Sequence, residues 1–299
     1  MDVLAAFWNL VPVTLVQGLL YGFVALGIMI PFRLLAFPDL TSEGSFPLGA
    51  CLAGALLAAG AGPWTAVAAA VAGGAAAGAT TAFVHLRFRI NTLLAGILVM
   101  TILYSLNLRI LGQANVALLS NETVFSAISP RVVTSVGLQL AVFAPVVAAA
   151  LLALRWLAQT EIGLSLRAVG ANAALAPALR IDTVRFVVAG LALGNALAAL
   201  AGALAVQLQG FADVNMGLGV LINGLAAVII GETLVGRHTV GRQIAAPVLG
   251  SIVYYQIVSL GLSLGLKPSD LKLATGLFVL VTLALPALRR DAAPDAMRE

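Results

Sequence analysis

Charged side chains are scarce in this chain of 299 residues. Only 9% of its residues are Asp, Glu, Lys or Arg, while 61% are apolar, and the mean hydropathy is +1.07. A soluble domain carries about 25% charged residues, which cover its exterior. Because so small a charged fraction cannot cover a water-facing surface, the sequence excludes a soluble protein. It predicts an integral membrane protein whose partner is the lipid bilayer.

Groups that carry out catalysis or hold metals are also rare. The single cysteine, Cys51, excludes an internal disulfide and a cysteine metal site, and the two histidines, His85 and His238, lack metal-ligand spacing. The chain has no G-x-x-x-x-G-K-[ST] phosphate loop, and neither of its lysines, Lys267 and Lys272, follows a glycine. No Ser-His-Asp set can be proposed. We therefore expect no enzyme, no ATP hydrolysis by this chain, no metal and no cofactor.

Aromatic residues make up only 6% of the chain, whereas Ala, Gly and Leu dominate. This composition favours closely packed helices over a β-barrel, which carries girdles of aromatic side chains. The net charge of +4 and the pI of 9.7 come from an excess of arginine. In a membrane protein such an excess reflects basic residues retained in cytoplasmic loops, so it does not indicate binding to nucleic acid.

The apolar residues fall into segments long enough to cross a bilayer as helices, which takes about 20 residues each. The sequence predicts an all-α membrane protein, a single domain over residues 1–299 with about nine (eight to ten) transmembrane helices. Segments 45–61 and 214–230 are short, begin at polar stretches and are candidates for partly re-entrant helices. The nine predicted segments are 11–33, 45–61, 64–84, 92–110, 137–157, 186–206, 214–230, 244–264 and 272–288.

Basic residues predict the orientation of these segments. If the loop with Arg87 and Arg89 is cytoplasmic, alternation places twelve of the sixteen basic residues on that side and four outside. The N-terminus is then outside and the C-terminal tail inside. The first ten residues could instead form an interfacial helix or part of a tenth span.

The centres of the predicted spans contain amides and hydroxyls but no acid or base. Ion-coupled carriers usually place ionisable groups there, so their absence argues against proton coupling. A channel or an ion-coupled carrier nevertheless remains the alternative class. The polar residues either form hydrogen bonds between helices or line a pathway; they are Gln17, Asn107, Gln139, Asn195, Asn223 and Gln256.

Two carboxylates, Asp39 and Glu43, interrupt the apolar sequence between the first two predicted spans. Pro38 and Gly44 stop the helices there, and the backbone groups so freed must face protein or a water-filled cavity. By the predicted topology this stretch lies at the cytoplasmic end of the two spans. We expect the carboxylates to stay hydrated or to pair with an arginine such as Arg33. An ordinary turn, with Asp39 and a nearby threonine capping the next helix, is the simpler alternative.

A similar stretch occurs later in the chain. Residues 37–41 read FPDLT and residues 211–215 read FADVN, and each leads into an apolar segment with several glycines. Topology places the first inside and the second outside. Inverted repeats are common in transporters and place matching breaks around a central pathway, although so short a match can also arise by chance. Phe211, Asp213 and Asn215 are therefore candidates for an outer part of the pathway, or for a simple turn between helices.

The cytoplasmic loop 158–182 predicts two short helices on the membrane surface. Thr160 and Glu161 can cap the first helix, which then presents one apolar face, and Gly170 ends it. Asn172 can cap the second helix. Another protein could bind such a surface, although a generic amphipathic loop would look the same. The residues of the predicted apolar face are Ile162, Leu166 and Val169.

Parts of the sequence resemble a known family. The loop resembles the coupling loop of permease subunits in the branched-chain amino acid and ribose superfamily of ABC importers, whose fold is the type II importer permease. The stretches FPDLTSEGSFPLGA, INTLLAGILVMTILYSLNLRILGQANVALL and GFADVNMGLGVLINGLAAVIIGE resemble its tryptophan/tyrosine-type branch. The resemblance covers about residues 14–285. Two positions in the loop depart from it, namely Arg180 in place of a usual glycine and Pro177 within the second helix.

The resemblance implies a function and partners. Two permease copies, a homodimer or a heterodimer, would each bind a cytoplasmic ATPase, and a periplasmic or lipoprotein binding protein would deliver an amino acid, aromatic by resemblance, across the bacterial inner membrane. A scaffold that transports nothing is a weaker alternative. The expected ATPase-coupling residues are Thr160, Glu161, Gly163, Arg167, Ala168, Gly170 and Asn172. The expected cytoplasmic gate comprises Phe37, Pro38, Asp39, Thr41, Ser42 and Glu43.

Overall fold

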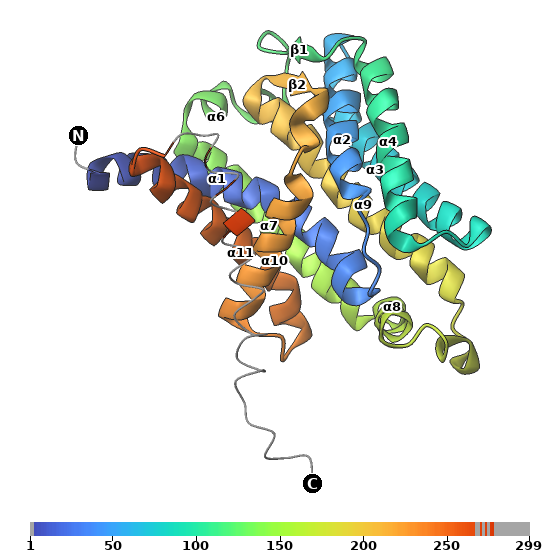
Figure 1. Ribbon diagram of the computed structural model, residues 1–299. Coiled ribbons are helices and arrows are strands. Elements are labelled where there is room, and N and C mark those ends of the chain that lie inside the picture. The colour runs from blue at the N-terminus through green and yellow to red at the C-terminus, as the bar shows by residue number, and fades with distance from the viewer. Residues whose placement is uncertain (1–2, 267–269, 271–272, 274–275, 278–299) are drawn as a thin grey trace, which may run out of the picture.

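The computed structural model describes residues 3–266, 270, 273, 276 and 277. Almost all of this part is helical (Figure 1). The long helices are α1 (Val3–Met29), α2 (Ser42–Ala58), α3 (Pro63–Phe88), α4 (Thr92–Leu111), α7 (Val136–Gln159), α9 (Thr183–Gln209), α10 (Val220–Val235) and α11 (Val240–Ser263). The short helices are η1 (Ile30–Leu34), α5 (Val124–Ile128), α6 (Pro130–Thr134), α8 (Glu161–Ala171), η2 (Ala176–Leu179) and η3 (Val214–Gly217).

Seven of the described helical segments are long and apolar enough to cross a membrane. They correspond to seven of the nine predicted segments, which confirms the polytopic all-helical class. The predicted segment 45–61 corresponds to α2, which has only 17 residues. The ninth segment, 272–288, lies almost wholly outside the described residues, so the total of nine helices stays a prediction.

The first break in the bundle separates α1 from α2. Helix α1 continues into the π-helical turn η1, which contains Pro31 and ends at Leu34. Ala36 has a positive φ of 51°, and residues 36–40 belong to no helix or strand before α2 begins. Figure 1 shows this segment turning back into the bundle, so that α2 starts near its middle and runs to the end where β1 lies. Because α2 starts within the bundle, its 17 residues are enough to reach that end.

The second break, between α9 and α10, has the same local chemistry. Oδ1 of Asp39 accepts a hydrogen bond from the backbone N–H of Thr41 (2.9 Å), and Oδ1 of Asp213 accepts one from the N–H of Asn215 (2.7 Å). Each aspartate thus forms an Asx turn just before a new helix begins. The similarity noted between residues 37–41 and 211–215 is therefore also a similarity of backbone structure.

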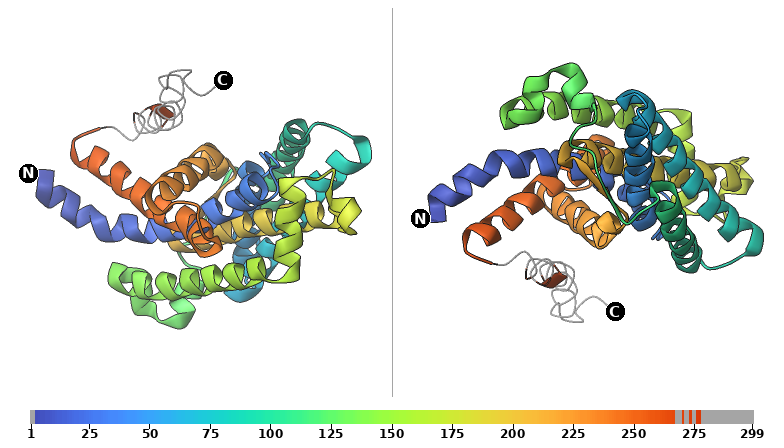
Figure 2. Two further views of the ribbon diagram at one scale, coloured as in Figure 1. Left: turned by 90° about the horizontal axis from the view of Figure 1, so that it is seen from below. Right: turned by 90° about the horizontal axis from the view of Figure 1, so that it is seen from above.

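The packing around the two breaks is also similar. Helix α1 packs against α10 and α11, whereas α9 packs against α2 and α3. The helices α1 and α9 cross each other at Gly27 and Gly194, where a Cβ on either residue would overlap the carbonyl oxygen of the other. In both views of Figure 2, α1 lies between α11 and α7. The two broken segments thus form the centre of the bundle.

Small residues allow the helices to approach closely, as the composition of the chain predicts. Gly74 and Gly78 of α3 face the backbone of α9, where a Cβ would overlap the carbonyl oxygens of Asn195 and Leu191. Because the apolar side chains gain nothing by leaving lipid for protein, close van der Waals contact at such positions provides much of the stabilisation.

A small β-ladder closes one end of the bundle, which the all-α prediction did not include. Strand β1 (Asn115–Ala117) pairs antiparallel with β2 (Phe211–Asp213), so that Asn115 lies opposite Asp213. We call this the β1–β2 end. Figure 1 shows α8 at the opposite end of the bundle, which we call the α8 end. The loops and helix ends with the predicted cytoplasmic arginines, as far as the structure describes them, lie toward the α8 end.

Candidate functional site

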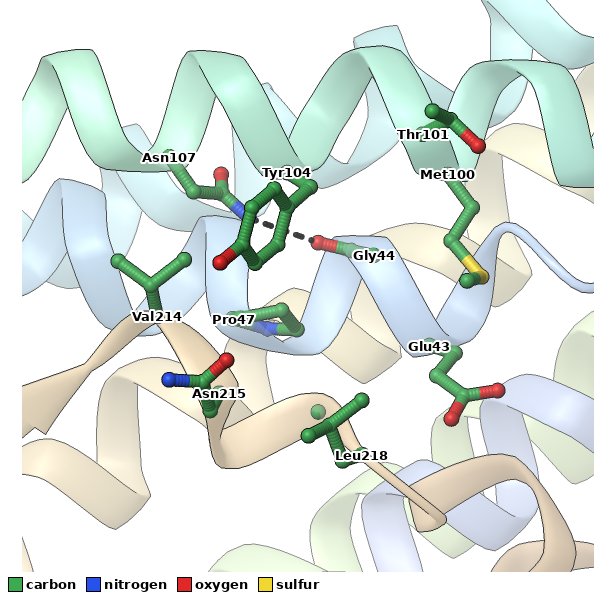
Figure 3. A pocket seen from close by; sticks show the side chains of 11 residues that line it. Glu43, Gly44, Pro47, Met100, Thr101, Tyr104, Asn107, Val214, Asn215 and Leu218 are labelled. Atoms are coloured by element: carbon green, nitrogen blue, oxygen red, sulfur yellow. Dashed lines mark hydrogen bonds between the residues drawn. The ribbon is translucent and has the colours of Figure 1, made fainter. Parts of the chain in front are cut away.

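A pocket of about 240 Å³ lies where the two breaks meet (Figure 3). The start of α2, the turn η3 and one face of α4 form its walls. The predicted gate residue Glu43 and the predicted outer residue Asn215 both line it, so the structure brings together two stretches that topology had placed on opposite faces. The other lining residues are Gly44, Pro47, Met100, Thr101, Tyr104, Asn107, Val214, Gly217 and Leu218.

Glu43 connects the two breaks directly. Its Oε1 accepts a hydrogen bond from the backbone N–H of Gly219 at 2.8 Å, just before α10 begins. Its Oε2 has no hydrogen-bond partner among the described residues, and the side chain is half-buried. Glu43 therefore stabilises the start of α10 with one oxygen and leaves the other available.

Asp39 occupies a different position from the one predicted. It is fully buried, and Nδ2 of Asn195 donates to its Oδ2 at 2.7 Å. Asn195 lies at the middle of α9, and Ser45 donates to its Oδ1 at 2.8 Å. The expectation of a hydrated carboxylate at the cytoplasmic end was therefore wrong. The expectation that no acid lies at mid-span was also wrong, because the segment 36–40 turns back into the bundle and places Asp39 beside the middle of α9.

Arg33 does not pair with Asp39 or Glu43, the carboxylates for which it was the expected partner. Nη2 of Arg33 lies 2.6 Å from Oε2 of Glu232, and Nη2 of Arg237 lies 2.7 Å from the same oxygen. Glu232 is buried at the end of α10, while both arginines are partly exposed. This cluster of three charges joins the end of α1 to the end of α10.

The other predicted gate residues pack against neighbouring helices. Phe37 is buried and meets the ring of His85 edge-on, with centroids 5.1 Å apart. The hydroxyls of Thr41 and Thr81 are 2.7 Å apart. Ser42 is buried and its Oγ has no partner in the described part of the chain. Pro38 lies within the segment 36–40. The gate residues thus form one contiguous stretch, but only Glu43 lines the pocket.

Helix α8 starts as the sequence predicts. The Thr160 hydroxyl accepts from the N–H of Gly163 at 3.5 Å, and Glu161 lies in the first turn. Arg167 donates to the carbonyl of Ala158 at 3.1 Å, which ties α8 to α7. Ala168 is half-buried on the following turn.

Two details of the α8 prediction were wrong. The buried face consists of Gly163, Leu166 and Val169, whereas Ile162 is 57% exposed. Gly170 does not end the helix, which continues to Ala171. It instead packs against the backbone at Leu34, and a Cβ at this position would overlap the Leu34 carbonyl oxygen. Helix α8 is therefore seated on the end of the broken helix α1.

The two departures from the family pattern lie at the end of the loop. Asn172 accepts from the N–H groups of Ala174 and Leu175, as expected of a cap, but only the four-residue turn η2 follows, with Pro177 near its start. Arg180 ends this turn with φ 60° and ψ 24°. Glycine adopts this left-handed conformation without steric cost, so it fits the position better than arginine does.

The outer residues belong to the β1–β2 end. Asp213 also accepts from Nδ2 of Asn115 at 3.0 Å. Phe211 is 38% exposed, and Leu119, on the loop after β1, is 87% exposed. These apolar side chains are accessible in the described part of the structure.

Several of the polar residues that the sequence places within predicted spans form hydrogen bonds in the structure. Asn195 and Asn107 bond to other helices, and Asn223 accepts from the hydroxyl of Tyr254. Gln139 instead lies half-buried in the first turn of α7, where its Nε2 donates to the Val133 carbonyl. The roles of Tyr104 and Glu232 were missed, because only the fold brings them to the breaks. Within the described residues, no three His, Cys, Asp or Glu side chains gather into a possible metal site.

The fold and the site together define a polytopic helical membrane protein with two broken segments around a central pocket. Residues 12–285 match the family described as branched-chain amino acid transport system / permease component, and the chain belongs to this family. It is therefore a permease component of an ABC-type transport system and not an enzyme.

Two curated proteins are similar over most of their length. The tyrosine transport system permease protein of Clostridioides difficile (strain R20291) is 38% identical over 269 residues, which cover 90% of this chain and 88% of that protein. The uncharacterized protein RP368 of Rickettsia prowazekii (strain Madrid E) is 32% identical over 280 residues, or 92% and 97% of the two chains. No solved structure matches the chain.

Proposed function

We propose that this chain is the transmembrane permease subunit of an ABC importer for an aromatic amino acid, with the pathway passing the two breaks. A separate ATPase drives it and a substrate-binding protein supplies it. Family membership supports the type of system, and the similarity to a tyrosine transport system permease protein supports the substrate class.

The packing of α8 against the end of α1 is the observation that supports mechanical coupling between a partner and the first break. Gly170 packs against Leu34, two residues before the segment 36–40, which leads through Asp39 to Glu43. A displacement of α8 by a partner would therefore be transmitted to the first break through direct contact. Because interfaces this close cannot deform continuously, such a push would favour a discrete rearrangement.

The exposed side of the same loop supports a partner at this end. Four large apolar side chains are more than half exposed there, which is unusual for a surface that faces water. An ATPase subunit is the partner we propose, bound through residues 158–182. The exposed side chains are Ile162, Leu164, Leu175 and Leu179.

The remaining partners follow from the same assignment. A second copy of the permease completes the pathway, and the β1–β2 end, with Phe211 and Asn215, contacts the binding protein or the arriving substrate. The α8 end then faces the cytoplasm of a bacterium and the β1–β2 end faces outward, in the inner membrane. The arginines near the α8 end agree with this orientation.

Reconstitution into vesicles tests this proposal. The permease, its ATPase and the binding protein are incorporated together, and uptake of radiolabelled L-tyrosine and L-tryptophan is measured. We expect uptake with ATP and none when either the ATPase or ATP is left out. Uptake by the permease alone on an ion gradient would instead favour a carrier, and the absence of any flux with all components would favour a scaffold.

A further inference from the structure

The pocket between α4, α2 and η3 contains one charged residue, Glu43. Its Oε1 is engaged by the N–H of Gly219, and its Oε2 has no partner among the described residues. Arg33, which the sequence suggested as its counter-charge, is bound to Glu232 instead. A carboxylate at this depth without a cation is costly, so the site favours a ligand that brings a positive charge.

The rest of the lining is suited to a flat apolar group. Met100 and Tyr104 lie one turn apart on α4, and they are faced by Pro47 of α2 and by Leu218, which directly follows η3 (Figure 3). Thioether and aromatic side chains make favourable contacts with aromatic rings. A side chain at Gly217 would overlap Pro47 and the backbone at Glu43, so a glycine is needed where η3 closes the pocket.

A second polar group, the side chain of Asn107, lines the same pocket. Asn107 is fully buried, and its Nδ2 donates weakly to the Gly44 carbonyl at 3.4 Å. Its Oδ1 has no hydrogen-bond partner within the described part of the chain. A buried acceptor without a partner costs free energy until a donor arrives. The lining thus offers acceptors and no cation.

The volume sets the size of the ligand. At about 30 Å³ for each water molecule in the liquid, 240 Å³ corresponds to roughly eight waters. Pockets for drug-sized ligands begin at about 300 Å³. The space therefore fits one amino acid.

We infer that this pocket binds the transported aromatic amino acid, with the substrate ammonium on Oε2 of Glu43 and its ring between Met100, Tyr104 and Leu218. The inference rests on the proposed function and adds the binding site and the recognised group. The ligand enters beside Tyr104, which is 52% exposed on α4. Recognition of the ammonium admits the whole class of aromatic amino acids and rejects aromatic acids without an amine.

Protection of an introduced cysteine tests the inference on the full-length permease in nanodiscs. The only native cysteine, Cys51, is buried, so Thr101→Cys supplies the accessible thiol. Its modification by a small maleimide is measured with L-tyrosine, with tyramine, which keeps the amine, and with 3-(4-hydroxyphenyl)propionate, which lacks it. Ser105→Cys, on the same helix but outside the lining, is the matched control.

We expect tyrosine and tyramine to slow modification at position 101 and to leave position 105 unchanged. Protection by the propionate should need about tenfold more ligand, the effect of losing one charge-assisted hydrogen bond. A second substitution, Glu43→Gln, is then made in the Thr101→Cys variant. It keeps an acceptor for the Gly219 N–H and should abolish this difference between the ligands. Equal protection by all three, or protection by none, would overturn the inference.

The vesicle uptake assay separates this inference from the proposed function. If the complete wild-type system takes up tyrosine while the ligands do not differ in protection, the binding site is wrong and the importer assignment stands. If amines protect position 101 but no amino acid is taken up with the ATPase and ATP present, the site stands and the transport function is wrong.

Discussion

The carboxylate of Asp39 accepts hydrogen bonds from neutral groups only, as far as the described residues show. At the middle of α9 no water is available in quantity to solvate it, so the amide of Asn195 carries much of this task. The same asparagine also accepts from Ser45 and donates to the Leu191 carbonyl. One side chain thus connects the first break to two helices.

Asn195→Leu is expected to destabilise the fold. The substitution preserves the approximate volume but leaves Asp39 and Ser45 without their partner, at a cost of about 3 kcal/mol for two buried groups. Thermal unfolding in detergent would show the loss. Asn115→Ala removes a similar Asn–Asp bond at the exposed β1–β2 end and should cost under about 1 kcal/mol. Equal effects of the two changes would contradict this account of Asp39.

Helix α8 illustrates what an element contributes beyond its sequence pattern. The pattern predicted a capped amphipathic helix, and Thr160 does cap it. The seat on α1 depends on Gly170, which the sequence suggested only as a helix end. Close packing of two backbones requires a residue without a side chain. That Gly170 has this role is known only from the tertiary structure, which places the Leu34 backbone against it.

If the ATPase binds at α8 as we propose, Gly170→Ala is expected to weaken its link to the first break. The added methyl group overlaps the Leu34 carbonyl, so α8 must move away from the end of α1. Uptake in the complete vesicle system should fall several-fold, while ATP hydrolysis by the bound ATPase continues. Ala171→Ser adds one atom at the adjacent exposed position and serves as the control. Normal uptake with Gly170→Ala would show that this seat does not transmit force.

The molecule as a whole is organised around the meeting of its two broken segments. Glu43 bonds to the start of α10 near the pocket, and Glu232 bonds to Arg33 and Arg237 at the α8 end. Two acids thus tie α10 to the first broken segment at different depths.

Glu232→Gln should loosen the α8 end. It removes the buried partner of two arginines, and because both arginines are partly exposed, we expect a loss of about 1–2 kcal/mol in thermal unfolding. Arg33→Gln should cost less, since Arg237 still pairs with the acid. If Arg33→Gln destabilised the protein as much as Glu232→Gln, the arginine at 237 would contribute nothing.

The sequence predicted the membrane class, seven of the spans and the two breaks, because hydropathy, span length and the Pro and Gly positions act locally along the chain. It also predicted the caps at Thr160 and Asn172, since capping depends on residues only a few positions apart.

The tertiary structure alone decided where the breaks go. Asp39 and Glu43 share one short stretch, yet the first is buried against Asn195 and the second lines the pocket with Asn215. A segment between two helices can leave the membrane surface or turn back into the bundle, and local sequence does not distinguish the two. The choice is made by the partners that satisfy its backbone and acids, and those partners are far away in the chain.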